Sequence, residues 1–267
     1  MEDKLLVKDL FKKSIYGVVG YVANIQDIDT IERYILFNKE VLLNFPLILV
    51  ATNYGDTSLK YEYHSRWTKY FNNVEFIDLE KNKGHNIGNL ELDNVVVSYV
   101  KQSKNYNWLV KSATDILIFE EILERNISLS DFYFLPSFGY SGIKDLEFNF
   151  VDCITPQTNF YIINTSKIDN LVTNSFLDES YNKIQKIENY NGRIWEYIPG
   201  WTCERILHKC VVRNLLKYEN LLTEKEVKKL YSYVISNNVN DPSHKNINTG
   251  GVCHFHFQNK PITYINE

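Results

Sequence analysis

The feature that most constrains the fold is a regular alternation of short apolar runs and amphipathic stretches between Tyr16 and Val110. The run Pro46–Ala51 (PLILVA) is continuously apolar and has the length of a strand, which is typical of a buried strand in a parallel sheet. Between Ile28 and Asn44 the apolar residues recur at helical spacing instead. Strands that alternate with helices in this way indicate right-handed βαβ units. We therefore expect an α/β fold with a mostly parallel central sheet flanked by helices.

The same patterns predict where the elements lie along the chain. Strands are expected at Tyr16–Ala23, Pro46–Ala51, Val74–Leu79 and from Trp108, with helices at Ile28–Asn44, Leu59–Phe71 and Leu90–Lys101. Beyond Phe119 the alternation loosens. There we expect strands at Phe132–Leu135 and Phe160–Ile163, helices at Glu204–Tyr218 and Thr223–Ser236, and a loop-like segment at Asn237–Glu267. No internal repeat or low-complexity linker interrupts the chain, so a single domain of residues 1–267 is predicted.

Composition excludes several classes of protein. The chain is 44% hydrophobic and holds 19 Tyr, 15 Phe and 4 Trp, which is far too much apolar surface for a disordered segment. Its 33 acidic residues outnumber 29 basic ones, giving a net charge of −4, whereas a nucleic-acid-binding protein normally has a basic excess. No apolar run approaches the roughly 20 residues of a membrane helix, and the N-terminus has no apolar core of a signal peptide. A soluble, cytoplasmic protein without a transmembrane segment is expected.

The common motifs of nucleotide-binding and hydrolytic α/β enzymes are missing. A dinucleotide fingerprint needs G-x-G-x-x-G directly after the first strand, but Gly17 and Gly20 lie inside the expected strand and no third glycine follows. The sequence contains neither a GxxxxGK[ST] phosphate loop nor a GxSxG elbow. Its four cysteines form no CxxC pair. These absences disfavour a dehydrogenase, a P-loop kinase and an α/β-hydrolase.

A polar cluster follows each of the first four expected strands. These clusters are Ala23-Asn24, Thr52–Asp56, Asn82–Asn89 and Lys111–Asp115. In open parallel sheets, ligands bind beyond the carboxyl ends of the strands, so the clusters predict a site at that edge. A single polar loop after a strand is also common without any ligand.

The order and spacing of these clusters resemble those of GT-A-fold glycosyltransferases, in the nucleotide-diphospho-sugar transferase superfamily. Ala51–Thr57 is similar to the turn after the second strand, Asn82–Asn89 to the N-x-G loop, and Asn107–Leu117 to the D-x-D region. The resemblance implies that residues 14–120 bind a nucleotide sugar, UDP- or GDP-linked, and that residues 121–267 form the acceptor-binding and catalytic half. The donor-binding residues that it implies are Ala23, Asn24, Asn53, Asn82, Gly84, His85, Lys111, Thr114 and Lys260.

The resemblance also implies a divalent metal, Mn²⁺ or Mg²⁺, although the D-x-D position here is Ala113-Thr114-Asp115 with one carboxylate. A single Asp can hold such an ion if phosphate oxygens and water supply the other ligands. The family often adds a histidine near the C-terminus, and His254 and His256 lie on one face of an expected strand. Two alternatives remain at this point: Asp115 as the N-cap of a helix at Ile116–Glu124, and a structural zinc site at the histidines.

Catalysis is assigned by the same resemblance to Glu204, in the segment GWTCER, as the base of an inverting transferase acting on a glycan or other hydroxyl acceptor. The neighbouring Trp201 and the more distant Tyr140 are expected to bind the acceptor, because aromatic rings stack on sugars. Glu204 could instead pair with Arg205 or stabilise the helix N-terminus. Two other functions stay open: a nucleotidyltransferase of related fold, and a sugar-binding module that has lost its activity.

Overall fold

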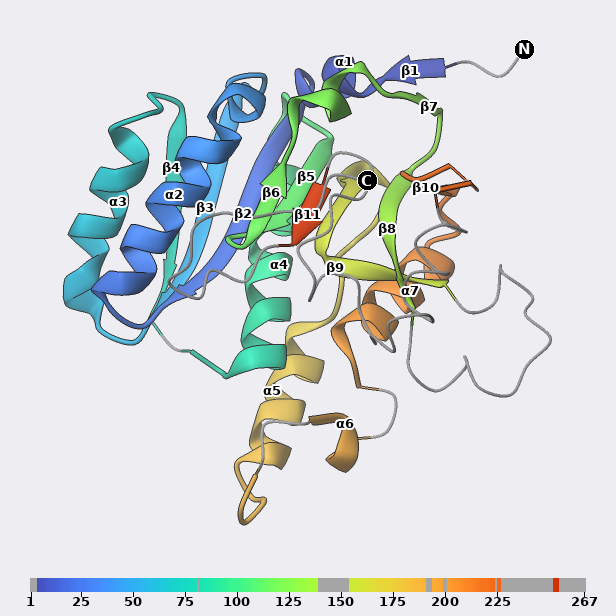
Figure 1. Cartoon of the computed structure of the whole chain (residues 1–267). Helices are drawn as coiled ribbons and strands as arrows, with labels where there is room; N and C mark the ends of the chain where they lie inside the picture. Colours follow the sequence, from blue (N-terminus) through green and yellow to red (C-terminus); the bar gives the residue numbers. More distant parts are fainter. Residues whose placement is uncertain are drawn as a thin grey trace.

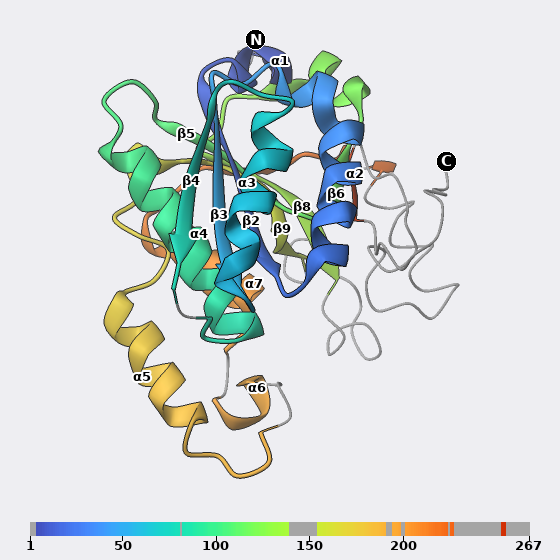
Figure 2. The same cartoon turned by 90° about the vertical axis from the view of Figure 1, so that its left-hand side faces the viewer.

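The computed structural model describes residues 4–80, 82–138, 154–190, 194–198, 201–223, 225–226 and 252–254. Its centre is a seven-stranded sheet with the strand order β10-β8-β9-β5-β2-β3-β4 (Figure 1). Neighbouring strands are parallel except for β9, which is antiparallel to both β5 and β8. Helices flank this sheet on both faces (Figure 2). The expected fold class, an α/β fold with a mostly parallel sheet, is therefore confirmed.

The first half of the chain follows the predicted alternation closely. Its strands and helices are β2 (Ser14–Val22), α2 (Ile25–Leu42), β3 (Leu47–Tyr54), η1 (Thr57–Leu59), α3 (Lys60–Thr68), β4 (Val74–Leu79), α4 (His85–Gln102) and β5 (Trp108–Ala113). The strand predicted at Val74–Leu79 has the predicted bounds. The helix predicted from Leu90 begins five positions earlier, at His85, because Ile87 and Leu90 both pack into a buried cluster.

Within its described residues, the second half extends the sheet and adds the helices α5, α6 and α7. The sheet strands here are β8 (Phe132–Phe138), β9 (Ile154–Asn164) and β10 (Tyr218–Asn220), and the helices are α5 (Asn174–Ile184), α6 (Ile194–Tyr197) and α7 (Cys203–Arg213). Two small antiparallel pairs lie outside the main sheet: β1 (Lys4–Leu6) with β7 (Asn126–Ser128), and β6 (Ile116–Ile118) with β11 (Val252–His254). The remaining short elements are α1 (Val7–Phe11), η2 (Glu120–Glu124) and η3 (Thr165–Lys167).

Two predicted elements are corrected. The helix expected to reach Tyr218 ends at Arg213, because Leu215 adopts a positive φ of 52°, a conformation that terminates helices. The helix considered after Asp115 is wrong, since Ile116–Ile118 is a strand, followed by a 3₁₀ turn at Glu120–Glu124. The helix predicted at Thr223–Ser236 and the loop at Asn237–Glu267 lie mostly outside the described residues.

Alternating residues of the strands supply two separate cores. Val18, Val50 and Val110 face the core that α2 and α3 cover. Val19, Leu49 and Leu109 face the opposite core, which α4 and α7 cover. Figure 2 shows α2 and α3 on one side of the sheet and α4 on the other. A sheet buried on both faces leaves its carboxyl edge as the place where polar groups reach the surface. Among the described residues, no helix has the length and apolarity needed to cross a lipid bilayer.

Candidate functional site

The carboxyl ends of β2 and β3 approach each other closely at Gly55. Its backbone N–H donates to the Val22 carbonyl at 2.8 Å, and a Cβ at this position would lie 2.8 Å from the Tyr21 hydroxyl and 3.1 Å from Cα of Ala23. A side chain at position 55 would therefore push the two strand ends apart. Because Gly55 has no Cβ, the segment after β3 can pack closely against the segment after β2.

Asn24 begins α2 as part of a capping box. Its side-chain oxygen accepts from Asp27 N at 3.2 Å, while the Asp27 carboxylate accepts from the backbone N–H groups of Ala23 (2.8 Å) and Asn24 (3.2 Å). Ala23 and Asn24 are both exposed at the strand edge. Both residues thus take part in the capping of α2. Donor binding by either residue stays a prediction.

Asn53 is a buried amide with an unpaired acceptor. Its side chain is 1% exposed, and its Oδ1 has no hydrogen-bond partner among the described residues. It lies against the first turn of α4, where a Cβ at Gly88 would be 3.6 Å from Asn53 Nδ2 and 3.0 Å from Asn82 Oδ1. Buried polar groups are usually paired in folded proteins, so Oδ1 of Asn53 can accept a hydrogen bond from a group that reaches this strand end.

The loop before α4 is organised by Asn82 and Gly84. Asn82 Oδ1 accepts from Gly84 N at 2.9 Å, and Gly84 has a φ of 92°, which favours glycine. Gly84 is also the N-cap residue of α4, a helix of 18 residues whose positive end faces this edge. The intervening Lys83, which sequence analysis passed over, pairs with Glu91 at 2.7 Å and Asp178 at 2.8 Å and ties the loop to α4 and α5. The His85 side chain lies outside the described residues.

Asp115 lies in the turn between β5 and β6, next to the strand that contains His254. The preceding Thr114 packs over β2, where a Cβ at Gly20 would be 2.6 Å from Thr114 Cγ2. The pairing of β6 with β11 sets His254 opposite Ile116, so the backbone brings His254 beside Asp115 from far along the chain. The predicted residues Tyr140, His256 and Lys260, and the His254 side chain, lie outside the described residues. Among the side chains that the structure describes, no three His, Cys, Asp or Glu form a metal cluster.

The expectation that Lys111 binds the donor is corrected. Its side chain is 3% exposed, and its ammonium lies 3.2 Å from the Asp93 carboxylate and donates to the Thr158 carbonyl. It also lies 5.7 Å from the ring centre of Tyr161, whose hydroxyl donates to Asp93 at 3.2 Å. These partners hold Lys111 inside the protein, between β5, β9 and α4. Burial is the main cause that raises the pKa of the Asp93 carboxyl, and Lys111 opposes it.

Glu204 lies at the carboxyl edge of the sheet, in the first turn of α7. Thr202 caps this helix by accepting from Arg205 N at 3.2 Å, and Glu204 Oε1 accepts from the Thr158 hydroxyl at 3.3 Å. Thr158 belongs to β9, which runs antiparallel to β5 and begins beside the end of β5. Thr158 therefore joins the predicted base to the buried Lys111. The sequence gives no sign that Thr158, Asp93 and Tyr161 connect Lys111 with Glu204, since they come from two separate elements and belong to no motif.

Trp201 does not offer a face to an acceptor, which corrects a second expectation. It is 1% exposed, its Nε1 donates to Ser180 Oγ at 2.9 Å, and its ring stacks on Phe176 with centres 5.9 Å apart. These contacts hold Trp201 in the core formed with α5 and α6. Trp201 is therefore a core residue of the protein, and its ring is not available to stack on a sugar.

Comparisons with known proteins address the overall fold. Neither a protein-family model nor a curated protein sequence matches the chain. Similar solved structures include the galactosyltransferase LgtC in complex with donor and acceptor sugar analogues (10% identity, 90% of this chain and 86% of that one, TM-score 0.48). Others are the glycosyltransferase GlyE of Streptococcus pneumoniae TIGR4 (10%, 92% and 55%, 0.44) and a nucleoside-diphosphate-sugar pyrophosphorylase from Vibrio cholerae RC9 (12%, 76% and 90%, 0.41).

Proposed function

We propose that the chain is a glycosyltransferase that moves a sugar from a nucleotide-diphosphate donor to a hydroxyl acceptor. The observation that supports this most is the meeting of four separated segments at one sheet edge. The ends of β2, β3 and β5 bring Asn24, Asn53 and Asp115 there, and the β6–β11 register adds His254 next to Asp115. The resemblance of the three polar segments to the GT-A family points the same way.

The donor would bind along the ends of β2 and β3 and the start of α4. The unpaired Asn53 Oδ1 offers an acceptor for a base or ribose group, and the N-terminus of α4 offers backbone N–H groups and positive potential for phosphate. Asn24, Asn82, Gly84 and Thr114 complete this donor site in the proposal. Lys260 is proposed as a phosphate contact in place of the buried Lys111.

The proposed metal site consists of Asp115 and His254, with His256 as the alternative histidine. A carboxylate and an imidazole suit Mn²⁺, and Mg²⁺ would rely on the carboxylate and phosphate oxygens. The placement of both residues by the β5–β6 turn and by strand pairing is compatible with such a site. A bound ion would neutralise negative charge on the departing diphosphate.

Glu204 is the proposed general base. Its carboxylate would take the proton of the acceptor hydroxyl, while the hydroxyl oxygen bonds to the anomeric carbon and the bond from that carbon to the diphosphate breaks. Thr158 holds one carboxylate oxygen, which fixes the orientation of the side chain. Direct attack of this kind inverts the configuration of the sugar. Tyr140 is proposed to contact the acceptor.

Replacing Glu204 by Gln tests this assignment. The amide keeps the size of the side chain and its contact with Thr158 but cannot accept a proton, so sugar transfer should fall about 10²- to 10⁴-fold. Donor affinity, measured by calorimetry with Mn²⁺, should stay unchanged. The matched control is Glu40→Gln, an exposed position on α2, which should transfer at the wild-type rate.

Three results would contradict the proposal. Transfer at the wild-type rate in Glu204→Gln would exclude Glu204 as the base. Donor binding without any transfer or hydrolysis in the wild-type protein would indicate a sugar-binding module. Release of pyrophosphate from a nucleoside triphosphate and a sugar phosphate would indicate a nucleotidyltransferase.

A further inference from the structure

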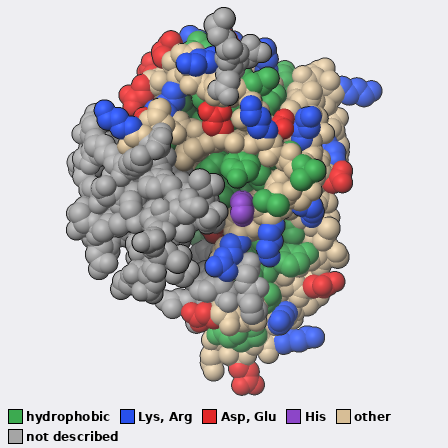
Figure 3. Space-filling view, turned by 90° about the vertical axis from the view of Figure 1, so that its right-hand side faces the viewer, with side chains coloured by type: hydrophobic (Ala, Val, Ile, Leu, Met, Phe, Trp, Pro, Cys, Tyr) green, Lys and Arg blue, Asp and Glu red, His purple; other side chains and the backbone are tan. Residues whose placement is uncertain are grey.

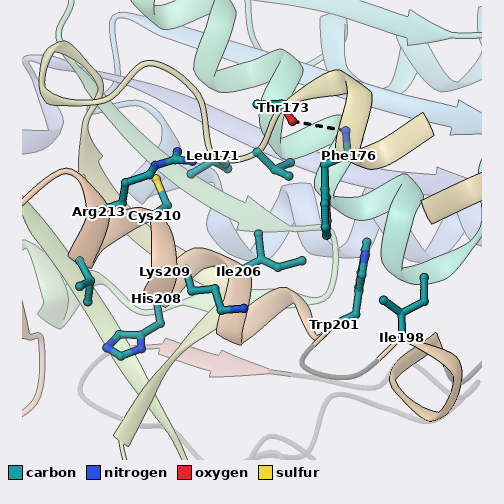
Figure 4. Close-up of a pocket in the computed structure, with 12 residues that line it drawn as sticks. Leu171, Thr173, Phe176, Ile198, Trp201, Ile206, His208, Lys209, Cys210 and Arg213 are labelled. Atoms are coloured by element: carbon teal, nitrogen blue, oxygen red, sulfur yellow. Dashed lines mark hydrogen bonds between the residues drawn. The ribbon is translucent and has the colours of Figure 1, made fainter. Parts of the chain in front are cut away.

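A cavity of about 660 Å³ lies between α7 and the segment that leads into α5 (Figure 4). This volume is within the range of pockets that hold small apolar or amphipathic molecules. Much of its lining is apolar, including Leu171, Phe176, Ile198 and Ile206. The basic side chains in the lining are His208, Lys209 and Arg213, and none of the described residues that line it is Asp or Glu.

The solvent face of α7 continues this basic character. Positions i, i+3, i+4, i+7 and i+8 of a helix share one face, and here these are all exposed: Arg205, His208, Lys209, Val212 and Arg213. The opposite side of the helix is buried. Val212 is 54% exposed and lies among the four basic side chains of this face. Val212 therefore presents apolar surface to solvent within the basic face.

Beyond the end of α7, the exposed apolar surface increases. Leu215 is 89% exposed and Tyr218 52%, and the exposed Lys217 lies between them in sequence. Figure 3 shows this side of the molecule, where hydrophobic side chains lie in and around a hollow with Lys and Arg side chains beside them. The whole chain has a net charge of −4, so the concentration of cations here is local.

We propose that this basic face, defined as Arg205, His208, Lys209, Val212, Arg213, Leu215, Lys217 and Tyr218, docks on the surface of an anionic lipid bilayer. Cations attract the phosphate groups of acidic lipids, and exposed Leu, Val and Tyr side chains enter the boundary between headgroups and acyl chains. The cavity beside Lys209 and Arg213 is large enough to admit part of an acyl chain. The proposal does not depend on the transferase activity proposed above.

Co-sedimentation of the whole protein with vesicles tests the proposal. Wild-type protein should bind vesicles of phosphatidylglycerol and phosphatidylcholine about tenfold more strongly than vesicles of phosphatidylcholine alone, and added salt should weaken the binding. Lys209→Glu with Arg213→Glu should abolish the preference. Leu215→Asn should reduce binding several-fold without harming the fold, because Asn tolerates the positive φ at this position.

The matched control is Lys13→Glu with Arg33→Glu, which makes the same change in net charge at two exposed positions outside the basic face. This control should bind like wild type, and circular dichroism should show that every variant is folded. If the control and the α7 variant lost binding to acidic vesicles equally, the loss would be explained by net charge alone, and the proposal would be overturned. Failure of the wild-type protein to bind the acidic vesicles would also overturn it. A third result would overturn the proposal. The wild-type protein would run as a dimer in gel filtration and not bind vesicles, and Lys209→Glu with Arg213→Glu would convert the dimer to a monomer.

Discussion

At the scale of single residues, the buried pair of Lys111 and Asp93 supports the position of Glu204. Lys111 donates to the carbonyl of Thr158, and the hydroxyl of the same Thr158 donates to Glu204. Asp93 balances the charge of Lys111 in a region that excludes water, and Tyr161 donates a further hydrogen bond to it. Lys111, which was expected to bind the donor, thus stabilises the fold around the candidate base.

Lys111→Met should destabilise the protein by about 3–5 kcal/mol, because it leaves the Asp93 carboxylate buried without its cation. The double variant Lys111→Met with Asp93→Leu should recover most of this loss, since both charges are then gone. Urea unfolding of the two variants and the wild type measures the difference. A single variant as stable as the wild type would show that the pair does not matter to the fold.

At the scale of secondary-structure elements, the contact between β2 and the β5–β6 turn positions Asp115. Gly20→Ala would set a Cβ 2.6 Å from Thr114 Cγ2 and shift the turn, so Mn²⁺-dependent affinity for UDP should fall about tenfold. Gly17→Ala is the matched control on the same strand. Its Cβ would meet Val96 and, at 2.7 Å, Leu109 in the core, costing about 1–3 kcal/mol of stability without changing UDP affinity. Unchanged UDP affinity in Gly20→Ala would contradict this role of the turn.

The contact between α2 and α3 predicts a specific pH dependence. Hydrogen bonds from Lys69, Tyr70 and Arg66 lower the pKa of Glu32 to about 2. The unfolded chain has a pKa near 4.3, so these contacts stabilise the protein fully above about pH 5, and the stabilisation is lost as the pH falls towards 2. Glu32→Gln should therefore be less stable than wild type at neutral pH, and the gap should narrow in acid. Urea unfolding between about pH 3 and pH 7 measures this, with Glu40→Gln as an exposed control on α2. A gap that stays constant with pH would show that Glu32 has an ordinary pKa.

An element could be predicted from the sequence when the residue pattern within its own segment determines it, and could not when it depends on contacts with a distant segment. Val74–Leu79 was predicted with its observed bounds, because strand-forming apolar residues fill a segment of strand length, although Glu75 and Asp78 interrupt it and this edge strand is only partly buried. The start of α4 was missed, because its first turn holds polar residues beside the candidate site. The strand at Ile116–Ile118 depends on pairing with Val252–His254, which no local pattern can show.

The site divides in the same way. Asn53, Asn82 and Asp115 could be located from strand ends alone, since a parallel sheet brings those ends to one edge. The burial of Lys111 and Trp201 could not, because it depends on Asp93 from α4 and on Ser180 from α5. A motif identifies which residues lie near an edge, and only packing decides which of them face outward.

At the scale of the whole molecule, the two halves of the chain meet at the end of β5. The first half contains the proposed donor-binding residues Asn24 and Asn53 and the proposed metal ligand Asp115, and the second half contains Glu204 on α7 and His254 on β11. A donor half and an acceptor half within one sheet stay a prediction. The division at about residue 120 is itself a prediction from the sequence.

The most direct test of a metal-assisted donor site is a thermal-shift screen of UDP-, GDP-, CMP- and dTDP-sugars with and without Mn²⁺. One UDP- or GDP-sugar should raise the melting temperature only when Mn²⁺ is present, because binding to the folded state stabilises it. Asp115→Asn should lose this shift, while Asp9→Asn, an exposed position on α1, should keep it. No shift with any donor in the wild-type protein, or an equal shift in Asp115→Asn, would contradict the proposed site.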